Sequence, residues 1–172
     1  MMSQASALHD AQPGDRAGAL PAQYLTFSLA AETFAIGILV IKEIIEYRAP
    51  TEVPLGPRNV RGVINLRGAV VPVVDLQSRF GQPSSAVGKR SCIVIVEIAQ
   101  QDERHVIGVI VDAVNEVIEI AATDVEPPPS FGARIRSDFI AGIGKVRGRF
   151  VVLLDVDRVL TPDAAAPSST VH

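Results

Sequence analysis

The chain has 172 residues, of which 48% are hydrophobic, and its 16 Lys and Arg against 19 Asp and Glu give a net charge of −3. A chain of this size buries enough apolar surface to fold without a disulfide or a metal ion, and its single cysteine, Cys92, excludes an intrachain disulfide framework. The acidic balance, with no clustered basic footprint, argues against nucleic acid or an anionic membrane as the partner.

The two ends of the chain differ in composition from its middle. Residues 1–22 are rich in Ala, Gln, Pro, Gly and Asp, and residues 161–172 read T-P-D-A-A-A-P-S-S-T-V-H. Both stretches offer little to bury, so we expect a disordered arm at 1–22 and a flexible tail at 161–172. The first stretch lacks the pattern of a secretory signal, and no apolar run approaches the roughly 20 residues of a membrane span. We therefore expect a cytoplasmic protein.

Between these ends, short apolar segments rich in Val and Ile alternate with turn residues, which favours an all-β class. Proline-rich loops at 48–58 and 126–132 and a polar connector at 81–90 interrupt the series. Short helices are predicted at Leu76–Phe80 and Val156–Leu160, N-capped by Asp75 and Asp155. The predicted strands are, in chain order, Tyr24–Leu29, Thr33–Ile38, Lys42–Tyr47, Val60–Leu66, Ala69–Val74, Ser91–Ile98, Val106–Asp112, Val114–Ile120, Ile140–Val146 and Phe150–Leu154.

One predicted hairpin places a charge inside a very apolar part of the chain. Arg67 and Gly68 separate Val60–Leu66 from Ala69–Val74, and glycine adopts the positive φ of a tight turn without steric cost. Arg67 then lies at the tip, outside the core. Its position alone fits a solvated turn arginine as well as one that contacts a partner. Pro72 cannot donate a ladder hydrogen bond, which predicts a sheet edge or a bulge.

The chain contains an internal repeat. A shift of 80 residues lays 60–76 over 140–156, and a shift of 73 lays 43–46 over 116–119. Two matches in the same order predict two similar β-subdomains of about five strands, each ending in a hairpin and an Asp-capped turn. The identical pairs in the first match are Gly62 and Gly142, Arg67 and Arg147, Gly68 and Gly148, Val71 and Val151, and Asp75 and Asp155; in the second they include Glu43 and Glu116.

The sequence offers no credible catalytic or cofactor site. His9, His105 and His172 lie at no metal-ligand spacing, and Cys92 sits in an apolar run that predicts a buried, inert thiol. The glycines of 142–148 resemble a phosphate loop, but they lead into a strand where such a loop opens a helix. We therefore expect no enzymatic activity and no cofactor. The pattern favours a binding module whose strand edges, loops and hairpin tips carry its function.

The run R-G-V-I-N-L-R-G-A-V-V-P-V-V-D-L at 61–76 resembles the signature of the CheW family, the coupling proteins of bacterial chemotaxis. The resemblance covers essentially the whole predicted domain, residues 23–160. It begins at Q-Y-L-T-F-S-L and continues through F-A-I-G-I-L-V-I-K-E-I-I-E-Y, I-G-V-I-V-D-A-V-N-E-V-I and P-P-P-S-F to L-L-D-V-D-R-V-L.

The resemblance implies a fold and a set of partners. CheW-like proteins consist of two SH3-like five-stranded β-barrels packed together, and they lack enzymatic activity. They couple the cytoplasmic tips of chemoreceptors, the methyl-accepting chemotaxis proteins, to the regulatory domain of the histidine kinase CheA, and other CheW copies can join them in rings. The implied location is cytoplasmic, with recruitment to membrane-associated receptor arrays. A CheW-like adaptor in a related array that controls pili or another output remains an alternative.

The resemblance also implies binding residues. Glu43, Ile41, Gly62, Asn65, Arg67 and Gly68 match family positions tied to receptor or kinase coupling, and Phe131 matches an aromatic of the second ring contact with the kinase. Where the family often carries a basic residue five positions before that aromatic, this chain has Glu126, so the charge complementarity of this contact is not expected to carry over unchanged.

Two of these residues have an expected role in the contact itself. We expect Gly62 to allow close backbone approach of a partner. We expect Arg67 to pair with Glu43 across neighbouring strands and to exchange this carboxylate for one on a receptor. An exposed pair contributes little to stability, which suits a switchable contact.

Overall fold

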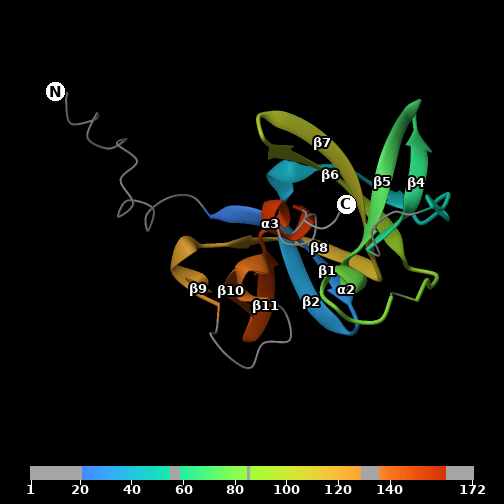
Figure 1. The fold of residues 1–172 in the computed structure, drawn as a ribbon. Helices are drawn as coiled ribbons and strands as arrows, with labels where there is room; N and C mark the ends of the chain where they lie inside the picture. The colour runs from blue at the N-terminus through green and yellow to red at the C-terminus, as the bar shows by residue number, and fades with distance from the viewer. Residues whose placement is uncertain (1–20, 55–58, 85, 129–135, 162–172) are drawn as a thin grey trace.

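A computed structural model describes residues 21–54, 59–84, 86–128 and 136–161, and within them the chain is built almost entirely of strands (Figure 1). The predicted all-β class is confirmed, and β1 begins two residues earlier than predicted. The strands are β1 (Ala22–Leu29), β2 (Glu32–Gly37), β3 (Ile41–Glu46), β4 (Val60–Leu66), β5 (Ala69–Asp75), β6 (Cys92–Gln100), β7 (Glu103–Val111), β8 (Ala113–Ile120), β9 (Val125–Glu126), β10 (Ile140–Val146) and β11 (Arg149–Leu154). The helices are α2 (Leu76–Arg79) and α3 (Val156–Leu160), with 3-10 turns at Ile38–Val40, Ala122–Asp124 and Ser137–Phe139.

The strands form two curved sheets. One has the order β3-β6-β7-β5-β4, and we call it barrel 1; the other has the order β8-β1-β2-β11-β10-β9, and we call it barrel 2. Each sheet contains one parallel pair, β5 with β7 and β2 with β11, among antiparallel neighbours. The two-residue strand β9, which the sequence did not predict, adds a sixth strand to barrel 2.

Each barrel takes strands from both sequence repeats. In the chain, one repeat runs from β1 to α2 and the other from β6 to α3. The hairpin β1–β2 nevertheless pairs with β8 and β11, and the hairpin β6–β7 pairs with β3 and β5. The blue strands therefore lie beside the orange and red ones in Figure 1. Because the repeats exchange their first hairpins, no single cut of the chain separates the two barrels.

Three apolar clusters form the core. One fills the space between the barrels, and each of the others fills a barrel interior. On β6, Ile93 and Ile95 belong to the interior of barrel 1, whereas Val94 and Val96 belong to the core between the barrels. Both faces of β6 are thus buried, which explains why its sequence C-I-V-I-V is continuously apolar rather than alternating. The interior of barrel 2 is formed by Ala35, Ile118, Ile120, Val151 and Leu153.

The two predicted aspartate caps are confirmed. The Asp75 side chain accepts hydrogen bonds from the backbone N–H groups of Gln77 (3.0 Å) and Ser78 (3.3 Å), and the Asp155 side chain accepts one from Arg158 N–H (3.2 Å). Asp75 is fully buried and also binds Arg61, whose Nη1 lies 2.8 Å from its Oδ2. The sequence did not predict this ion pair.

The ends of the two repeats are joined through one arginine. Arg79, at the end of α2, donates from Nε to the Val159 carbonyl (2.6 Å) and from Nη2 to the Thr161 carbonyl (2.8 Å). Its guanidinium also lies over the ring of Phe139, 4.7 Å from the centroid. Arg79 thus donates hydrogen bonds to carbonyl groups at the end of α3, which have no partner within the helix.

Parts of the sequence predictions lie outside the described residues. The expected arm at 1–22 and the expected tail at 161–172 fall almost wholly on residues 1–20 and 162–172, which the structure does not describe. Among the residues it does describe, no helix is long and apolar enough to cross a bilayer.

Candidate binding surface

The turn between β4 and β5 presents Arg67 to solvent. Arg67 and Gly68 both have positive φ, 53° and 89°, as a two-residue hairpin turn requires. The Asn65 side chain accepts a hydrogen bond from Gly68 N–H at 2.9 Å and so fixes the turn. The predicted hairpin is confirmed, although the positive φ of Arg67 itself was not foreseen. The Arg67 side chain is 72% exposed.

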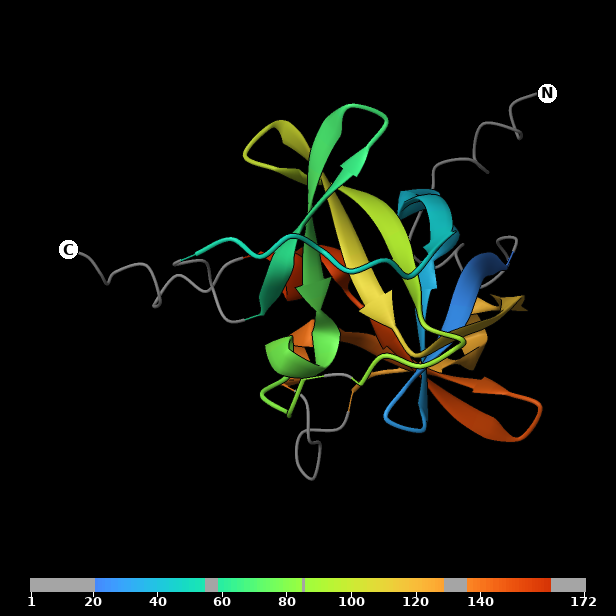
Figure 2. The same cartoon turned by 90° about the vertical axis from the view of Figure 1, so that its right-hand side faces the viewer.

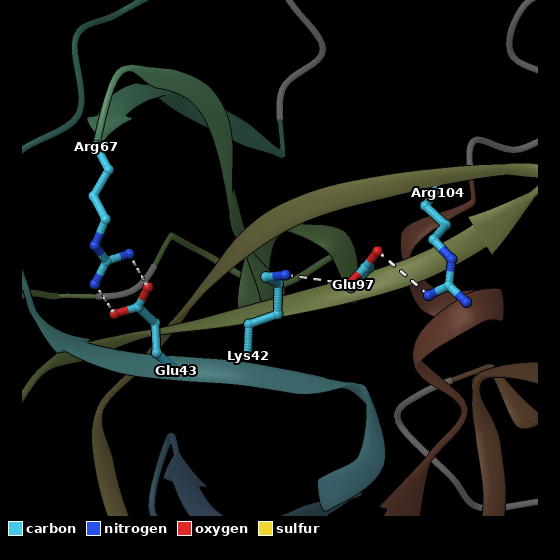
Figure 3. Close-up of polar contacts among 5 residues, drawn as sticks. All are labelled: Lys42, Glu43, Arg67, Glu97 and Arg104. Carbon is cyan, nitrogen blue, oxygen red and sulfur yellow. Dashed lines mark hydrogen bonds and ion pairs between the residues drawn. The ribbon is translucent and has the colours of Figure 1, made fainter.

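Arg67 binds Glu43 through both ends of its guanidinium (Figure 3). Nη1 lies 2.5 Å from Oε2, and Nη2 lies 2.8 Å from Oε1. The predicted ion pair is therefore present, but its strands are not neighbours. Glu43 lies on β3, at one edge of the sheet of barrel 1, and Arg67 follows directly on β4, at the other edge. The ion pair therefore connects the two edge strands of the sheet. These strands are the most distant in the strand order, and the curvature of the sheet brings them together.

The ion pair controls the protonation of Glu43. Hydrogen bonding by the Arg67 guanidinium lowers the pKa of the Glu43 carboxyl, and this effect outweighs the opposing effect of desolvation. Glu43 in turn raises the pKa of Arg67. Both groups are therefore charged at neutral pH, and a change of pH near neutrality does not separate them. A competing carboxylate can separate Arg67 from Glu43, because the guanidinium offers the same two hydrogen-bond donors to Glu43 and to the competitor.

A second ion-pair network lies beside the first (Figure 3). Glu97 on β6 accepts from Lys42 Nζ and from Arg104 Nη1, each at 3.3 Å. The hydrogen bond from Lys42 lowers the pKa of the Glu97 carboxyl, and Arg104 acts in the same direction. We call Lys42, Glu43, Arg67, Glu97 and Arg104 together the Arg67 face.

The Arg67 face is more basic at its surface than its composition indicates. The side chains of Lys42, Arg67 and Arg104 are 48%, 72% and 77% exposed, whereas those of Glu43 and Glu97 are 27% and 24% exposed. Three cations thus stand above two carboxylates. Sequence reasoning missed Lys42, Glu97 and Arg104, and the signal that could have found them was the charged Glu97 inside the apolar run of β6.

Apolar residues near this face divide into covered and exposed ones. Ile41, a predicted binding residue, is half-buried and packs against the core between the barrels. Ile44 on β3 and Val70 on β5 are 42% and 70% exposed. These two exposed side chains, rather than Ile41, offer apolar area to a partner, and the sequence did not single them out.

Gly62 is buried, and the backbone that approaches it belongs to the chain itself. A Cβ at Gly62 would lie 2.2 Å from the carbonyl oxygen of Thr51. Thr51 and Val63 exchange two backbone hydrogen bonds, at 2.8 and 2.9 Å, and hold the loop in this position. The expectation that a partner backbone approaches Gly62 is therefore corrected, because its own chain already occupies the space that the missing side chain leaves.

Three further residues singled out from the sequence are Phe131, Glu126 and Cys92. Phe131 lies outside the described residues, while Glu126 is exposed on β9 and pairs with β10. Cys92, predicted to be buried, is half-buried, and burial raises the pKa of its thiol, which keeps it protonated and unreactive. In the described part of the chain, no three His, Cys, Asp or Glu side chains are grouped so that they could hold a metal ion.

Comparison with known proteins identifies this arrangement. The sequence model of the CheW-like domain family matches residues 23–163 of this chain. The chain belongs to the CheW-like family. It is 34% identical over 141 residues to the chemotaxis protein CheW of Helicobacter pylori, covering 82% of each chain, and 31% identical over 141 residues to that of Bacillus subtilis, covering 82% of this chain and 88% of the relative.

A solved structure of the family has the same fold. The crystal structure of the scaffolding protein TtCheW from Thermoanaerobacter tengcongensis superimposes with a TM-score of 0.74 at 34% sequence identity, over 84% of this chain and 91% of that one. The predicted architecture of two SH3-like barrels and the CheW resemblance drawn from residues 61–76 are both confirmed.

Proposed function

We propose that the chain is a chemotaxis adaptor that couples chemoreceptors to the histidine kinase CheA, and that the Arg67 face is one of its docking surfaces. Membership of the CheW-like family supports the adaptor role. The observation that carries the choice of surface is the two-pronged Arg67–Glu43 pair, which links the edges of barrel 1 and is exposed on its arginine side.

In this role the chain performs no reaction of its own, and its output is the geometry in which it holds two partners. Family resemblance supports the cytoplasmic tip of a chemoreceptor and the regulatory domain of CheA as these partners. Recruitment to a receptor array at the membrane then follows from binding the receptor, without any insertion of the adaptor.

Docking on the Arg67 face proceeds by exchange of carboxylates. An incoming carboxylate replaces Glu43 on the Arg67 guanidinium, and the number of charged hydrogen bonds is the same before and after. Glu43 is left beside Lys42 and partly in water, so it remains stable as a free carboxylate. The exposed cations also attract an acidic partner before contact, which makes association faster at low salt.

The substitution Arg67→Ala tests this surface. We expect at least a tenfold loss of affinity for a receptor tip fragment or for the CheA regulatory domain, measured by isothermal titration calorimetry. Arg90→Ala, at an exposed loop arginine, is the matched control and should leave both affinities unchanged. Unchanged affinity of Arg67→Ala for both fragments would refute the assignment of the face.

A further inference from the structure

Barrel 2 repeats the Arg67 pair at its own hairpin. Arg147 and Gly148 form the turn between β10 and β11 with φ of 52° and 80°, close to the values at Arg67 and Gly68. Arg147 Nη1 lies 3.2 Å from Oε2 of Glu116. Glu116 lies on β8, the edge strand of its sheet, as Glu43 lies on the edge strand β3. The two pairs occupy equivalent places in the two repeats.

The second pair is looser than the first. Arg147 makes a single hydrogen bond to Glu116, whereas Arg67 makes two to Glu43. The Arg147 side chain is 71% exposed, like that of Arg67, but Glu116 is 51% exposed where Glu43 is 27% exposed. A partner that binds Arg147 therefore has to break one hydrogen bond within the chain, whereas a partner that binds Arg67 has to break two.

The second hairpin is also more basic and carries an aromatic ring. Lys145, Arg149 and Phe150 stand where the first hairpin has Asn65, Ala69 and Val70. All three are exposed, Phe150 by 64%. Arg147 pairs with Glu116, whereas Arg149 has no ion-pair partner within the described part of the chain.

These side chains surround a hollow of about 380 Å³ at the mouth of barrel 2. Arg147, Arg149 and Phe150 line it on the hairpin side, and Glu116 and Thr33 line it from β8 and the start of β2. Arginine and aromatic side chains around a concave surface are the residue types that contribute most to protein–protein binding.

We propose that the tip of the β10–β11 hairpin, with Glu116, is a second docking surface, for a protein partner whose contact face carries carboxylates around an apolar side chain. Charge complementarity selects this partner, because two arginines and a single carboxylate line the hollow, and the exposed Lys145 on the same hairpin adds a further positive charge. Glu116 and Phe150 interrupt the positive charge, which favours a mixed protein surface over an anionic lipid layer.

The two docking surfaces can be occupied together. The tip of β4–β5 and the tip of β10–β11 project at opposite ends of the molecule in both views (Figures 1 and 2). The chain is then bivalent, and it can connect two partners without either approaching the other. This inference rests on the proposed function for the choice of probes, although not for the geometry of the surface.

Nuclear magnetic resonance of the ¹⁵N-labelled full chain tests the proposal, with a receptor tip fragment and the CheA regulatory domain added in turn. We expect one of these probes to shift the amide signals of residues 146–150. Arg147→Glu should then weaken the binding of that probe at least tenfold, and Phe150→Ser should weaken it without a change of charge. Arg90→Glu is the charge-matched control, and thermal melts confirm that each variant is folded.

The outcomes separate this proposal from the proposed function. If the probes shift the signals of the Arg67 face and leave residues 146–150 unmoved, the second surface is refuted and the proposed function stands. If neither face responds, both are refuted. Shifts of residues 146–150 that appear on concentrating the chain alone, or on adding phosphatidylglycerol vesicles, would assign the surface to a second copy or to a membrane and would also refute the proposal.

Discussion

Gly62 lies directly beneath the carbonyl group of Thr51, so close that a Cβ at position 62 would stand 2.2 Å from the Thr51 oxygen. Its φ of +149° is also one that side chains rarely allow. We therefore expect Gly62→Ala to lower the free energy of unfolding by about 3 kcal/mol, from backbone strain together with the displacement of the Thr51 loop. Urea denaturation measures this loss.

Two further glycines separate the causes. Gly68 has positive φ but open space around its Cβ position, so Gly68→Ala reports strain alone, about 1 kcal/mol. Gly37 has open space and no positive φ, so Gly37→Ala should be neutral or slightly stabilising. Equal effects of Gly62→Ala and Gly68→Ala would show that the contact with Thr51 adds nothing.

The two aspartate caps allow a matched comparison. Asp75 caps α2 and binds Arg61 inside the protein, whereas Asp155 caps α3 with no ion pair in the described residues. We expect Asp155→Ala to cost about 1 kcal/mol, as the loss of a helix cap does. Asp75→Ala should cost about 3 kcal/mol or more, because it also leaves the Arg61 charge without its partner. Chemical denaturation of the two variants checks the order, and similar costs would contradict the importance of the Arg61 contact.

The turn between β1 and β2 is strained in a way that substitution can relieve. Ala30 and Ala31 have φ of 50° and 68°, although such two-residue turns favour Asn and Gly. Ala31→Gly should raise the free energy of unfolding by about 1 kcal/mol. The same change at Ala99, an exposed position within β6, should lower it by about 0.5–1 kcal/mol. A loss of stability at both positions would contradict the assigned turn geometry.

Local features of the fold could be predicted from the sequence because short-range chemistry determines them. Short apolar runs rich in Val and Ile marked the strands, Gly68 and Gly148 marked two of the hairpin tips, and Asp75 and Asp155 marked helix starts. The exchange of hairpins between repeats could not be predicted, since several similar strands compete for the same partners and only packing on both faces decides. Pro72 shows the consequence, because its predicted place at a sheet edge is wrong. Its strand β5 lies between β4 and β7, and the missing N–H is tolerated because the β5–β7 ladder begins only at Val73.

The candidate surface was predicted only in part for the same reason. Arg67 and Glu43 were found through family resemblance, and their pairing followed from opposite charge. Lys42, Glu97 and Arg104 come from three different strands, and their meeting depends on the register between those strands. The contact between Thr51 and Gly62 could not be predicted, because a loop residue that covers a glycine leaves no pattern in the sequence.

Acid should remove the contribution of the Arg67 pair to stability in a defined direction. The folded pKa of Glu43 is lowered from its usual value of 4.5. A carboxylate of this kind stabilises the fold above its unfolded pKa, and the contribution is lost as pH falls through the folded value. The difference in Tm between the wild type and Glu43→Gln should thus be constant from pH 7 to about pH 5 and should shrink below it. A difference that grows on acidification would contradict the pairing.

Exchange of carboxylates on Arg67 makes a prediction that direct binding by Glu43 does not. Glu43→Gln removes the internal competitor for Arg67 while keeping the size of the side chain. The affinity for the fragment that binds this face should therefore rise about two- to fivefold, measured by calorimetry at low salt. The gain should disappear in the double variant Arg67→Ala/Glu43→Gln, because the released arginine is its only source. Glu52→Gln, an exposed glutamate, is the control. A weaker complex of Glu43→Gln would mean that Glu43 itself contacts the partner, and the exchange would have to be abandoned.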